Sequence, residues 1–410
     1  MKKLLFFLLL LCFSLFFTAC SEAEIQPPAS DASIESTMPT SALTIMTEPP
    51  VAPVVEPKEY RVSFIAAGDN IVYYGNVRDA QKNAEGTEQR YDFRPSYTDI
   101  KEIVEEHDLA FINQETLMCG DGYDLSYYPR FNSPTELGNA VVDTGFDIIG
   151  MANNHMLDKG ESGLLATLDY WENQPVTRIG AYRSRADFDA ITVIEKNGIK
   201  IALLAFTYGT NGLSLPASSE VYIPYIDEAL IREKVTEAET LADVTIVSIH
   251  WGYENTFRTN DQQREIAKLI SECGGDVILG HHPHVIQPIE WIESGDNRTL
   301  CIYSLGNFMA EMAADYNMLG GMLSFELVKR GDEAVIVENA VFIPTVFDFN
   351  KSFYNNHIYL LEAYTEEQAK NHGISYYGNH TTLAKLRGYV TDTIPAEFLP
   401  AFLKEKPQSP

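Results

Sequence analysis

The stretch Asp276-Val277-Ile278-Leu279-Gly280-His281-His282-Pro283-His284 decides the fold that we expect for this chain. A short apolar run that ends at a glycine is typical of a buried strand in a parallel sheet. Pro283 cannot donate a backbone hydrogen bond, so strand pairing should stop before it and the histidines should lie on the loop beyond the strand. In open α/β sheets, ligands bind beyond this end of the strands.

The imidazoles of His282 and His284 are the first candidate metal ligands in this stretch. Neutral imidazole is the commonest protein metal ligand near pH 7. Residues two apart in an extended segment point to the same side, so both rings should face one site. The alternative interpretation is a pair of surface histidines that flank a turn.

Other apolar runs of the sequence end in the same way. The polar residues that follow them are Asp69, Glu115, Asn154 with His155, and His250. Any one of these alone is more typical of a helix cap, a turn or a surface residue. Parallel neighbours in one sheet, however, place their carboxyl ends at the same edge, so we expect these side chains to meet His282 and His284 in one cleft.

The chemistry of this set predicts a divalent transition metal as cofactor. Carboxylate, amide and imidazole groups together suit Mn, Fe or Zn better than Ca, which prefers oxygen ligands only. No cysteine belongs to the set, which argues against a structural zinc site.

Strands alternate with helices along the chain, which predicts a layered α/β fold. Asn197-Gly198 lies between two strand-like runs and predicts a tight hairpin turn. We expect helices near 97–106, 135–144, 163–171, 226–241 and 262–271, and strands near 62–67, 108–112, 145–152, 191–194, 200–206, 243–249 and 276–279. The later runs 285–291, 300–303, 322–328 and 334–342 are expected to be antiparallel strands that extend the sheets.

Composition fits a globular protein and excludes one class of partner. The chain has 410 residues, 45% of them hydrophobic and 11% aromatic, which is enough for a large core. Its formal net charge of −28 argues against nucleic acid as a partner, because such a surface needs clustered Lys and Arg.

Residues 1–20 are expected to be a lipoprotein signal peptide. Lys2-Lys3 precede an apolar run that is short for a membrane span, and Thr18-Ala19-Cys20 resembles a bacterial lipobox, with Phe17 where Leu is more usual. Cys20 would then carry the lipid anchor and place the chain on the extracellular face of the cytoplasmic membrane. The alternative is an ordinary secretory signal that is cleaved after Ala19.

The remaining chain divides into three parts. Residues 21–59 are rich in Pro, Ser and Thr and are expected to form a disordered linker. Residues 60–345 should form the folded domain, and 346–410 a C-terminal extension of unknown role. Cys119, Cys273 and Cys301 show no paired spacing, so we expect small buried hydrophobic residues, with a disulfide at Cys119 left open.

Several motifs, in this order, resemble those of the CapA family of poly-gamma-glutamate capsule synthesis proteins, within the calcineurin-like metallophosphatase superfamily. They are Asn113-Gln114-Glu115, Ala152-Asn153-Asn154-His155-Met156-Leu157-Asp158, His250-Trp251-Gly252, His282-Pro283-His284 and Ser304-Leu305-Gly306-Asn307-Phe308. The resemblance covers about residues 62–308. It implies a metallophosphatase-like four-layer α/β/β/α sandwich with a pair of mixed sheets.

The resemblance also implies roles for individual residues. The implied metal ligands, for one or two ions, are Asp69, Glu115, Asn154, His250, His282 and His284. His155 is similar to the catalytic imidazole of the superfamily, and Asp158 would orient it and raise its basicity. Asn307 and Arg130 are candidates for substrate contact, although Arg130 could equally be a surface salt-bridge partner.

The chain also departs from the superfamily pattern. Ile71 stands where the first motif has a metal-binding histidine, and Asn113-Gln114-Glu115 replaces a Gly-Asp-x-x-Asp motif. One of two metal positions is therefore short of a ligand, so a single ion is an alternative. His281 stands where glycine is usual, and we expect it to lie behind the ligands.

Three functional hypotheses follow. The first is a membrane-anchored, metal-dependent hydrolase of phosphoesterase type that acts on an anionic envelope polymer. The second is a non-catalytic accessory subunit of a membrane polymer synthase, which Ile71 favours. A third, a sugar- or nucleotide-binding lipoprotein without metal, has only Trp251 beside His250 to suggest it.

Overall fold

A computed structural model describes residues 58–404. The predicted signal peptide with Cys20, the linker up to residue 57 and the last six residues lie outside this range. No helix within residues 58–404 is long and apolar enough to cross a membrane.

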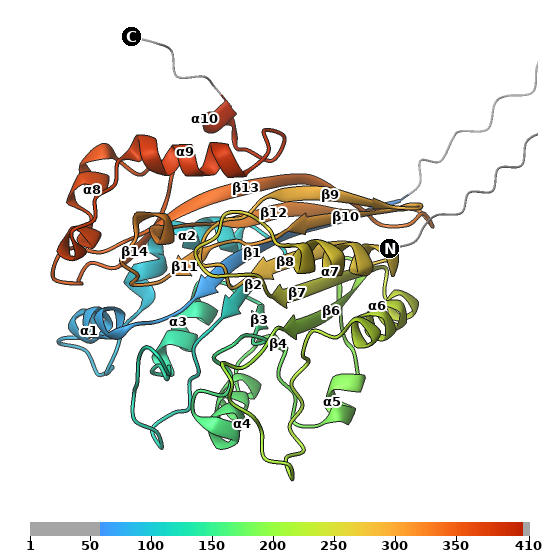
Figure 1. The fold of residues 1–410 in the computed structure, drawn as a ribbon, viewed down its shortest axis with the longest axis horizontal. Coiled ribbons are helices and arrows are strands. Elements are labelled where there is room, and N and C mark those ends of the chain that lie inside the picture. Colours follow the sequence, from blue (N-terminus) through green and yellow to red (C-terminus); the bar gives the residue numbers. More distant parts are fainter. Residues whose placement is uncertain (1–57, 405–410) are drawn as a thin grey trace, which may run out of the picture. The chain divides into compact units, whose positions relative to one another are not determined.

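The described strands form two mixed sheets (Figure 1). The first has the order β14-β13-β12-β1-β2-β3-β4, with β11 pairing with β1. Its strands are β1 (Glu59–Asn70), β2 (Leu109–Gln114), β3 (Ile148–Gly150), β4 (Thr177–Ile179), β11 (Asn307–Met309), β12 (Leu319–Arg330), β13 (Ile336–Asp348) and β14 (His357–Leu360). Strands β1 to β4 are parallel, and β12, β13 and β14 continue the sheet in antiparallel fashion.

The second sheet has the order β5-β6-β7-β8-β10-β9. Its strands are β5 (Thr192–Lys196), β6 (Ile199–Thr207), β7 (Val244–His250), β8 (Val277–His281), β9 (Ile289–Ser294) and β10 (Asn297–Ile302). The predicted hairpin joins β5 to β6, and Asn197 and Gly198 both have positive φ, as a tight hairpin turn requires. β10 was expected to be antiparallel, but it pairs with β8 in parallel; only β9, on its other side, is antiparallel to it.

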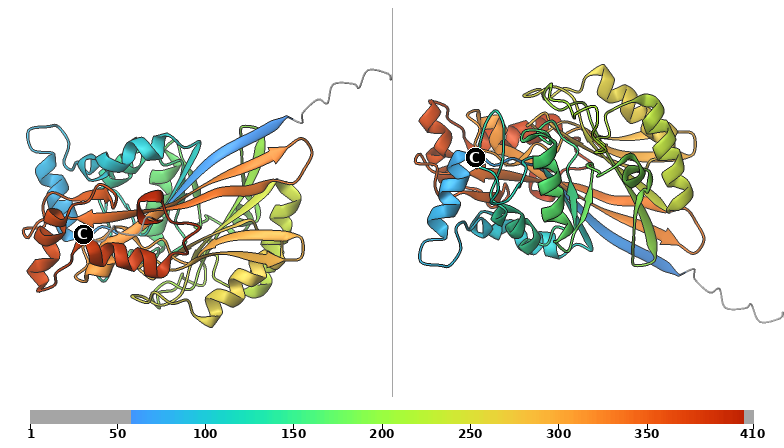
Figure 2. Two further views of the ribbon diagram at one scale, coloured as in Figure 1. Left: turned by 90° about the horizontal axis from the view of Figure 1, so that it is seen from above. Right: turned by 90° about the horizontal axis from the view of Figure 1, so that it is seen from below.

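Helices cover the outer faces of both sheets. The described helices are α1 (Tyr74–Asn83), α2 (Arg94–Glu105), α3 (Glu136–Asp143), α4 (Gly160–Glu172), α5 (Arg185–Asp189), α6 (Glu228–Leu241), α7 (Asp261–Glu272), α8 (Glu366–Asn371), α9 (Leu383–Thr393) and α10 (Ala401–Lys404), with 3-10 turns η1 (Asp315–Met318) and η2 (Gly373–Tyr377). α6 and α7 pack on the second sheet, and α2 packs beside β14 and α3 (Figures 1 and 2). The predicted four-layer α/β/β/α sandwich is confirmed.

The core lies in two layers that follow the alternation of side chains along the strands. Ile201, Leu203 and Ala205 of β6 face the first sheet and join its apolar residues in one large cluster. Ala202, Leu204 and Phe206, on the opposite face of the same strand, pack against α6 and α7. β6 therefore separates two cores, which is why its run Ile201–Phe206 is apolar.

The C-terminal extension does not form a separate body. The predicted boundary at residue 345 falls inside β13, and β14 pairs with that strand. Ile358, Leu386 and Val390 join the large core cluster. Among the described cysteines, all three are free, and Cys119 and Cys301 are buried as expected while Cys273 is partly exposed.

Gly68 allows β1 to pass close to the segment that begins β11. A side chain here would overlap the carbonyl oxygen of Gly306, which accepts a hydrogen bond from the backbone N–H of Asp69 at 2.9 Å. We expect Gly68→Ala to lower the free energy of unfolding of the full chain by about 1–3 kcal/mol, because the overlap is with backbone that cannot rotate away. Urea denaturation followed by circular dichroism measures this.

The matched control is Gly388→Ala in α9, where an added Cβ meets nothing within 4 Å. This substitution should instead stabilise the chain, by about 0.4–1 kcal/mol, because alanine loses less backbone entropy than glycine on entering a helix. Equal effects at the two positions would contradict the close approach described at Gly68.

Candidate metal centre

The structure brings the predicted ligands together at the carboxyl ends of the parallel strands. These ligands and the predicted catalytic pair are all buried, with exposures of 6% or less: Asp69, Glu115, Asn154, His155, Asp158, His250, His282 and His284. They were expected at one edge of one sheet. Instead, β1, β2 and β3 of the first sheet supply the carboxylates and Asn154, whereas β7 and β8 of the second sheet lead to the three imidazoles.

Glu115 lies at the centre of the cluster. Its Oε1 is 3.7 Å from Nε2 of His250 and 3.7 Å from Nε2 of His284. Burial, with the nearby charge of Asp69, raises the pKa of the Glu115 carboxyl well above its ordinary value. A position between two imidazoles suits the role of metal ligand that the resemblance implies for this carboxylate.

Asp69 is held as an anion on the other side of His284. Its Oδ2 is 3.1 Å from Nδ1 of His284, and its Oδ1 accepts from Nδ2 of Asn113 at 2.8 Å and lies 3.5 Å from Nδ1 of His281. Burial alone would raise the pKa of Asp69, but the contacts with His281 and His284 outweigh it and hold the pKa well below its ordinary value. His281 thus lies behind the ligands, as expected.

The three side chains of the motif Asn113-Gln114-Glu115 have different partners. Asn113 fixes Asp69, and Gln114 accepts from Nδ2 of Asn70 at 2.8 Å. Only the side chain of Glu115 is left free to face the cluster. The replacement of the superfamily's second motif therefore keeps one carboxylate in the site.

The three ligand imidazoles have different electrostatic surroundings. Burial and the nearby His282 lower the pKa of His250 well below its ordinary value, and burial and His284 lower the pKa of His282 to about 3. Burial would also lower the pKa of His284, but Glu115 and Asp69 raise it to about 9. His250 and His282 are therefore neutral near pH 7, the form in which imidazole binds metals.

The loop after β8 differs from the extended segment that was expected. His282 and His284 both have positive φ, at 96° and 56°. Their rings still face the same site, with centroids 5.8 Å apart. A sharply turned backbone, rather than the alternation of an extended one, brings them together, and such strained residues are typical of functional sites.

Asn154 and His155 follow β3 and face two different partners. Oδ1 of Asn154 is 2.9 Å from Nε2 of His250, which links the two sheets at the centre. Nδ1 of His155 is 2.8 Å from Oδ2 of Asp158. This contact has the geometry of the predicted pair, in which Asp158 orients the imidazole. The ring of Phe131 packs edge-on against that of His155, with centroids 4.7 Å apart.

The two candidates for substrate contact lie in different environments. Arg130 is exposed and lines a cavity of about 250 Å³ together with His155 and Asp158. Within residues 58–404 it makes no ion pair, so the alternative of a surface salt bridge is not observed. Asn307 is fully buried, and its amide donates to the carbonyls of His284 and Asn317. It therefore holds the loop of His284 and is not among the residues that line this cavity, so its contact with substrate stays a prediction.

Three further residues of the site were not predicted from the sequence. Tyr208 follows β6, and its ring lies 4.6 Å from that of His282; burial and the charge of Glu115 raise its pKa to about 12, so its hydroxyl keeps its proton. Oδ1 of Asn211, on the same loop, accepts from Nδ2 of Asn154 at 3.2 Å. Glu254, four residues after His250, lines the cavity with Arg130. The strand-end rule, applied to β6 as well, would have found the first two.

Ile71 confirms the departure noted in the sequence. It is buried against Phe131 and Ala310 in a small apolar cluster and offers no ligand atom. The cluster nevertheless fits a metal. Potential ligand atoms converge in two sets, and within each set all atoms lie within 4.8 Å of one another. One set comes from Glu115, His282 and His284, and the other from Asp69, Glu115 and His250.

Unpartnered atoms give an independent test of that fit. Both carboxylate oxygens of Glu115 and Nδ1 of His282 are buried without a hydrogen-bond partner in the described part of the chain. Native proteins rarely leave such groups unsatisfied. A divalent cation held by these residues would satisfy the carboxylate and imidazole groups together.

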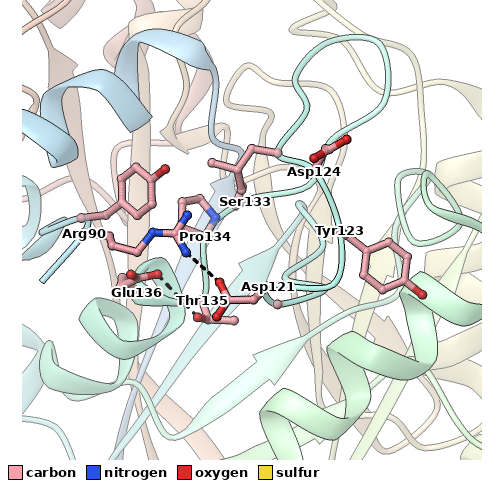
Figure 3. Close-up of a pocket in the computed structure, with 11 residues that line it drawn as sticks. Arg90, Asp121, Tyr123, Asp124, Ser133, Pro134, Thr135 and Glu136 are labelled. Atoms are coloured by element: carbon pink, nitrogen blue, oxygen red, sulfur yellow. Dashed lines mark hydrogen bonds and ion pairs between the residues drawn. The ribbon is translucent and has the colours of Figure 1, made fainter.

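Figure 3 shows another cavity, whose lining contains none of the residues of this cluster. It measures about 370 Å³ and has the exposed ion pair between Arg90 and Asp121 at its edge, with Nη1 and Oδ1 2.7 Å apart. Glu136 and Asp124 also line it, and no histidine does. It offers no ligand set like that at the strand ends.

The sequence that forms this site matches a known protein family. Residues 63–312, more than half of the chain, match the family described as "Bacterial capsule synthesis protein PGA_cap". The chain belongs to this family. The match contains every residue of the cluster, and the resemblance to CapA proteins seen in the sequence is confirmed.

Two curated PGA_cap relatives show how far the likeness extends. The "PGA biosynthesis protein CapA" of Bacillus subtilis is 36% identical over 202 residues, which cover 47% of this chain and 50% of that protein. The "Capsule biosynthesis protein CapA" of Bacillus anthracis is 26% identical over 206 residues, 49% of each chain. The chain thus spans about half the length of the curated relatives it matches.

Among solved structures, the NAD nucleotidase NadN of Haemophilus influenzae is similar, with a TM-score of 0.40 and 11% identity. The superposition covers 71% of this chain and 52% of that one. This likeness says nothing about the activity of the chain.

Proposed function

We propose that this PGA_cap protein is a metal-dependent hydrolase of phosphoesterase type that acts in the biosynthesis of an anionic capsule or envelope polymer. The contact of 2.8 Å between His155 and Asp158, at a cavity beside the ligand cluster, carries the proposal. A scaffold has no need of an imidazole that is oriented by a buried carboxylate and open to a cavity.

The residues of the chain divide the chemistry among them. A bound divalent ion would supply positive charge against the developing negative charge and lower the pKa of water. Asp69, Glu115, Asn154, His250, His282 and His284 would hold one or two such ions. Nδ1 of His155 donates to Asp158, which leaves Nε2 to deliver a proton to the leaving oxygen. Arg130 offers a positive charge to the part of the substrate in the cavity.

The full chain, purified in detergent, tests this proposal. After dialysis it should retain about one or more ions of Mn, Fe or Zn per chain, because six buried ligands converge on one site. It should also hydrolyse bis-p-nitrophenyl phosphate in a metal-dependent way. Elemental analysis and a colorimetric assay measure the two together. Well under one ion per chain, even after Mn or Zn is added, would count decisively against the proposal.

Ile71 favours a second candidate, a non-catalytic accessory subunit of a membrane polymer synthase. Its apolar surroundings leave the site one nitrogen ligand short of the superfamily pattern. Such a subunit would bind metal without turning over any ester, so metal content and hydrolysis separate the two candidates.

We also propose that Cys20 anchors the chain to the extracellular face of the cytoplasmic membrane, where polymer-synthase subunits would be its partners. The lipobox-like Thr18-Ala19-Cys20 supports this. Cys20→Ser should abolish metabolic labelling by a fatty acid and release the protein from the membrane fraction. Cys119→Ser, a buried cysteine of the folded part, is the matched control and should leave both unchanged. Labelling that survives Cys20→Ser would exclude this anchor.

A further inference from the structure

The cavity beside His155 holds two opposite charges that do not neutralise each other. It measures about 250 Å³, and its polar lining includes His155, Asp158, Asn154, Asn211, Arg130 and Glu254. Arg130 and Glu254 are both exposed, and within residues 58–404 neither forms an ion pair with the other or with a third residue.

Arg130 is tied to the catalytic pair through its neighbour. Its backbone N–H donates to the carbonyl of Tyr127 at 2.9 Å, which closes a tight turn. The N–H of the next residue, Phe131, donates to Oδ2 of Asp158 at 2.6 Å, the same oxygen that faces His155. The guanidinium is therefore carried on backbone whose position is fixed relative to the imidazole.

Glu254 is fixed from the other sheet. The N–H of the next residue, Asn255, donates to the carbonyl of Pro283 at 2.7 Å, and its Oδ1 accepts from Nδ2 of Asn317 at 2.8 Å. The Glu254 carboxylate lines the same cavity as the guanidinium of Arg130.

A ligand that carries both a negative and a positive charge would give the Arg130 guanidinium and the Glu254 carboxylate an ion-pair partner each. Its acidic group would accept from the guanidinium, and its ammonium would donate to the carboxylate, in two charge-assisted hydrogen bonds. A ligand with acidic groups only would meet the repulsion of Glu254 and of the neighbouring Asp158. An uncharged ligand would leave both charges as they are.

We propose that this cavity binds the leaving group of the substrate, and that Arg130 and Glu254 select a leaving group that carries both an acidic group and an ammonium, as an α-amino acid does. The proposal rests on the hydrolase function proposed above. In the step concerned, the ester P–O bond breaks and the oxygen of water forms the new bond to phosphorus. His155 gives a proton to the leaving oxygen, and a proton of the water replaces it.

Three phosphate monoesters that differ by one charged group test the selection. The leaving group of O-phosphoserine carries both charges. That of phosphoethanolamine carries the ammonium only, and that of 3-phosphoglycerate carries the carboxylate only. For the full chain loaded with Mn, kcat/KM for O-phosphoserine should exceed that for each of the other two by roughly tenfold or more, the size of one charge-assisted hydrogen bond.

Each variant should remove one preference and keep the other. Glu254→Gln should remove the preference for O-phosphoserine over 3-phosphoglycerate, and Arg130→Gln its preference over phosphoethanolamine. Glu293→Gln and Arg298→Gln, which break an exposed ion pair outside the cavity, are the controls and should keep both. Equal kcat/KM for the three esters overturns the proposal. So does an equal loss on all three in Arg130→Gln, because that would place the guanidinium on the phosphoryl group.

A binding measurement separates this proposal from the hydrolase function itself. If no ester is hydrolysed, calorimetric titration with serine should still show binding that is lost in both Arg130→Gln and Glu254→Gln but kept in the two controls. Absence of both turnover and serine binding overturns the selection. Turnover without any dependence on the leaving group's charges overturns it while the hydrolase function stands.

Discussion

Replacing His155 by alanine should reduce hydrolysis of a phosphodiester by about 10²–10⁴-fold, the usual contribution of a positioned proton donor, and should leave the metal content unchanged. The reason is that His155 lies outside both groups of converging ligand atoms. Nδ1 of its imidazole lies 2.8 Å from Oδ2 of Asp158, and its ring packs on Phe131. The loss should fall on kcat more than on KM, because the proton is transferred only as the bond breaks.

His380→Ala is the matched control for this substitution. His380 is exposed and lies far along the chain in the C-terminal part, so its loss should change neither activity nor metal content. Metal analysis and steady-state kinetics on the same preparations check both expectations. Unchanged turnover in His155→Ala would remove the catalytic role of this imidazole and would favour the accessory candidate.

Much of the fold could be predicted because local sequence signals agree with it. The apolar run at 276–280 becomes β8, and Asn197-Gly198 becomes the turn between β5 and β6. The direction of β10 was missed, because periodicity identifies a strand but not its neighbour. That strand pairs with β8, although β9 lies between the two in the sequence. Which strand becomes its neighbour depends on how the whole sheet packs.

The candidate site shows the same division. Residue type at strand ends identified Asp69, Glu115, Asn154, His250, His282 and His284, because every parallel strand delivers its last residues to one side of the molecule. The contribution of two sheets to one site, and the left-handed backbone of the two histidines after β8, depend on tertiary packing. No local pattern carries that information.

Residues that serve the site from loops were the hardest to predict. Glu254 lies among exposed residues after His250, where a carboxylate is unremarkable in a chain with net charge −28. Asn307 was predicted from its motif as a substrate contact, but the motif could not show its burial or its hydrogen bond to the loop of His284. Position in the fold, rather than residue type, decides whether such a side chain meets a ligand or holds its neighbours.

Glu115→Gln should have the largest effect on metal binding. Its carboxylate belongs to both groups of converging ligand atoms, so the substitution weakens every arrangement of one or two ions that the cluster allows. Mutation of a residue that only hydrogen-bonds to a metal ligand typically lowers metal affinity by roughly 10–100-fold. We expect a larger loss here, because Glu115 is itself a ligand. For the unaltered chain, an ion at 1,000 times its dissociation constant adds about 4 kcal/mol to the free energy of unfolding, and the variant should lose this increase.

Without metal, the same substitution should leave the thermal midpoint nearly unchanged. Both oxygens of Glu115 are buried without a hydrogen-bond partner, so the amide replaces one buried, unpartnered polar group by another of nearly the same shape. Glu311→Gln is the matched control: this carboxyl is partly buried outside the cluster, and burial raises its pKa to about 7. It should keep the full metal-induced increase in thermal midpoint, as measured by calorimetry with and without Mn.

The pH dependence gives a second check on Glu115. Since burial raises the pKa of its carboxyl, the metal-free protein holds a proton there that must leave before the carboxylate can bind an ion. The metal-induced rise in thermal midpoint should therefore grow as pH increases from the acid side toward neutrality, and this growth should be weaker in Glu115→Gln. A variant that keeps both the rise and its pH dependence would show that this carboxylate is not a ligand, and the cluster would then have to bind metal through Asp69 and the imidazoles alone.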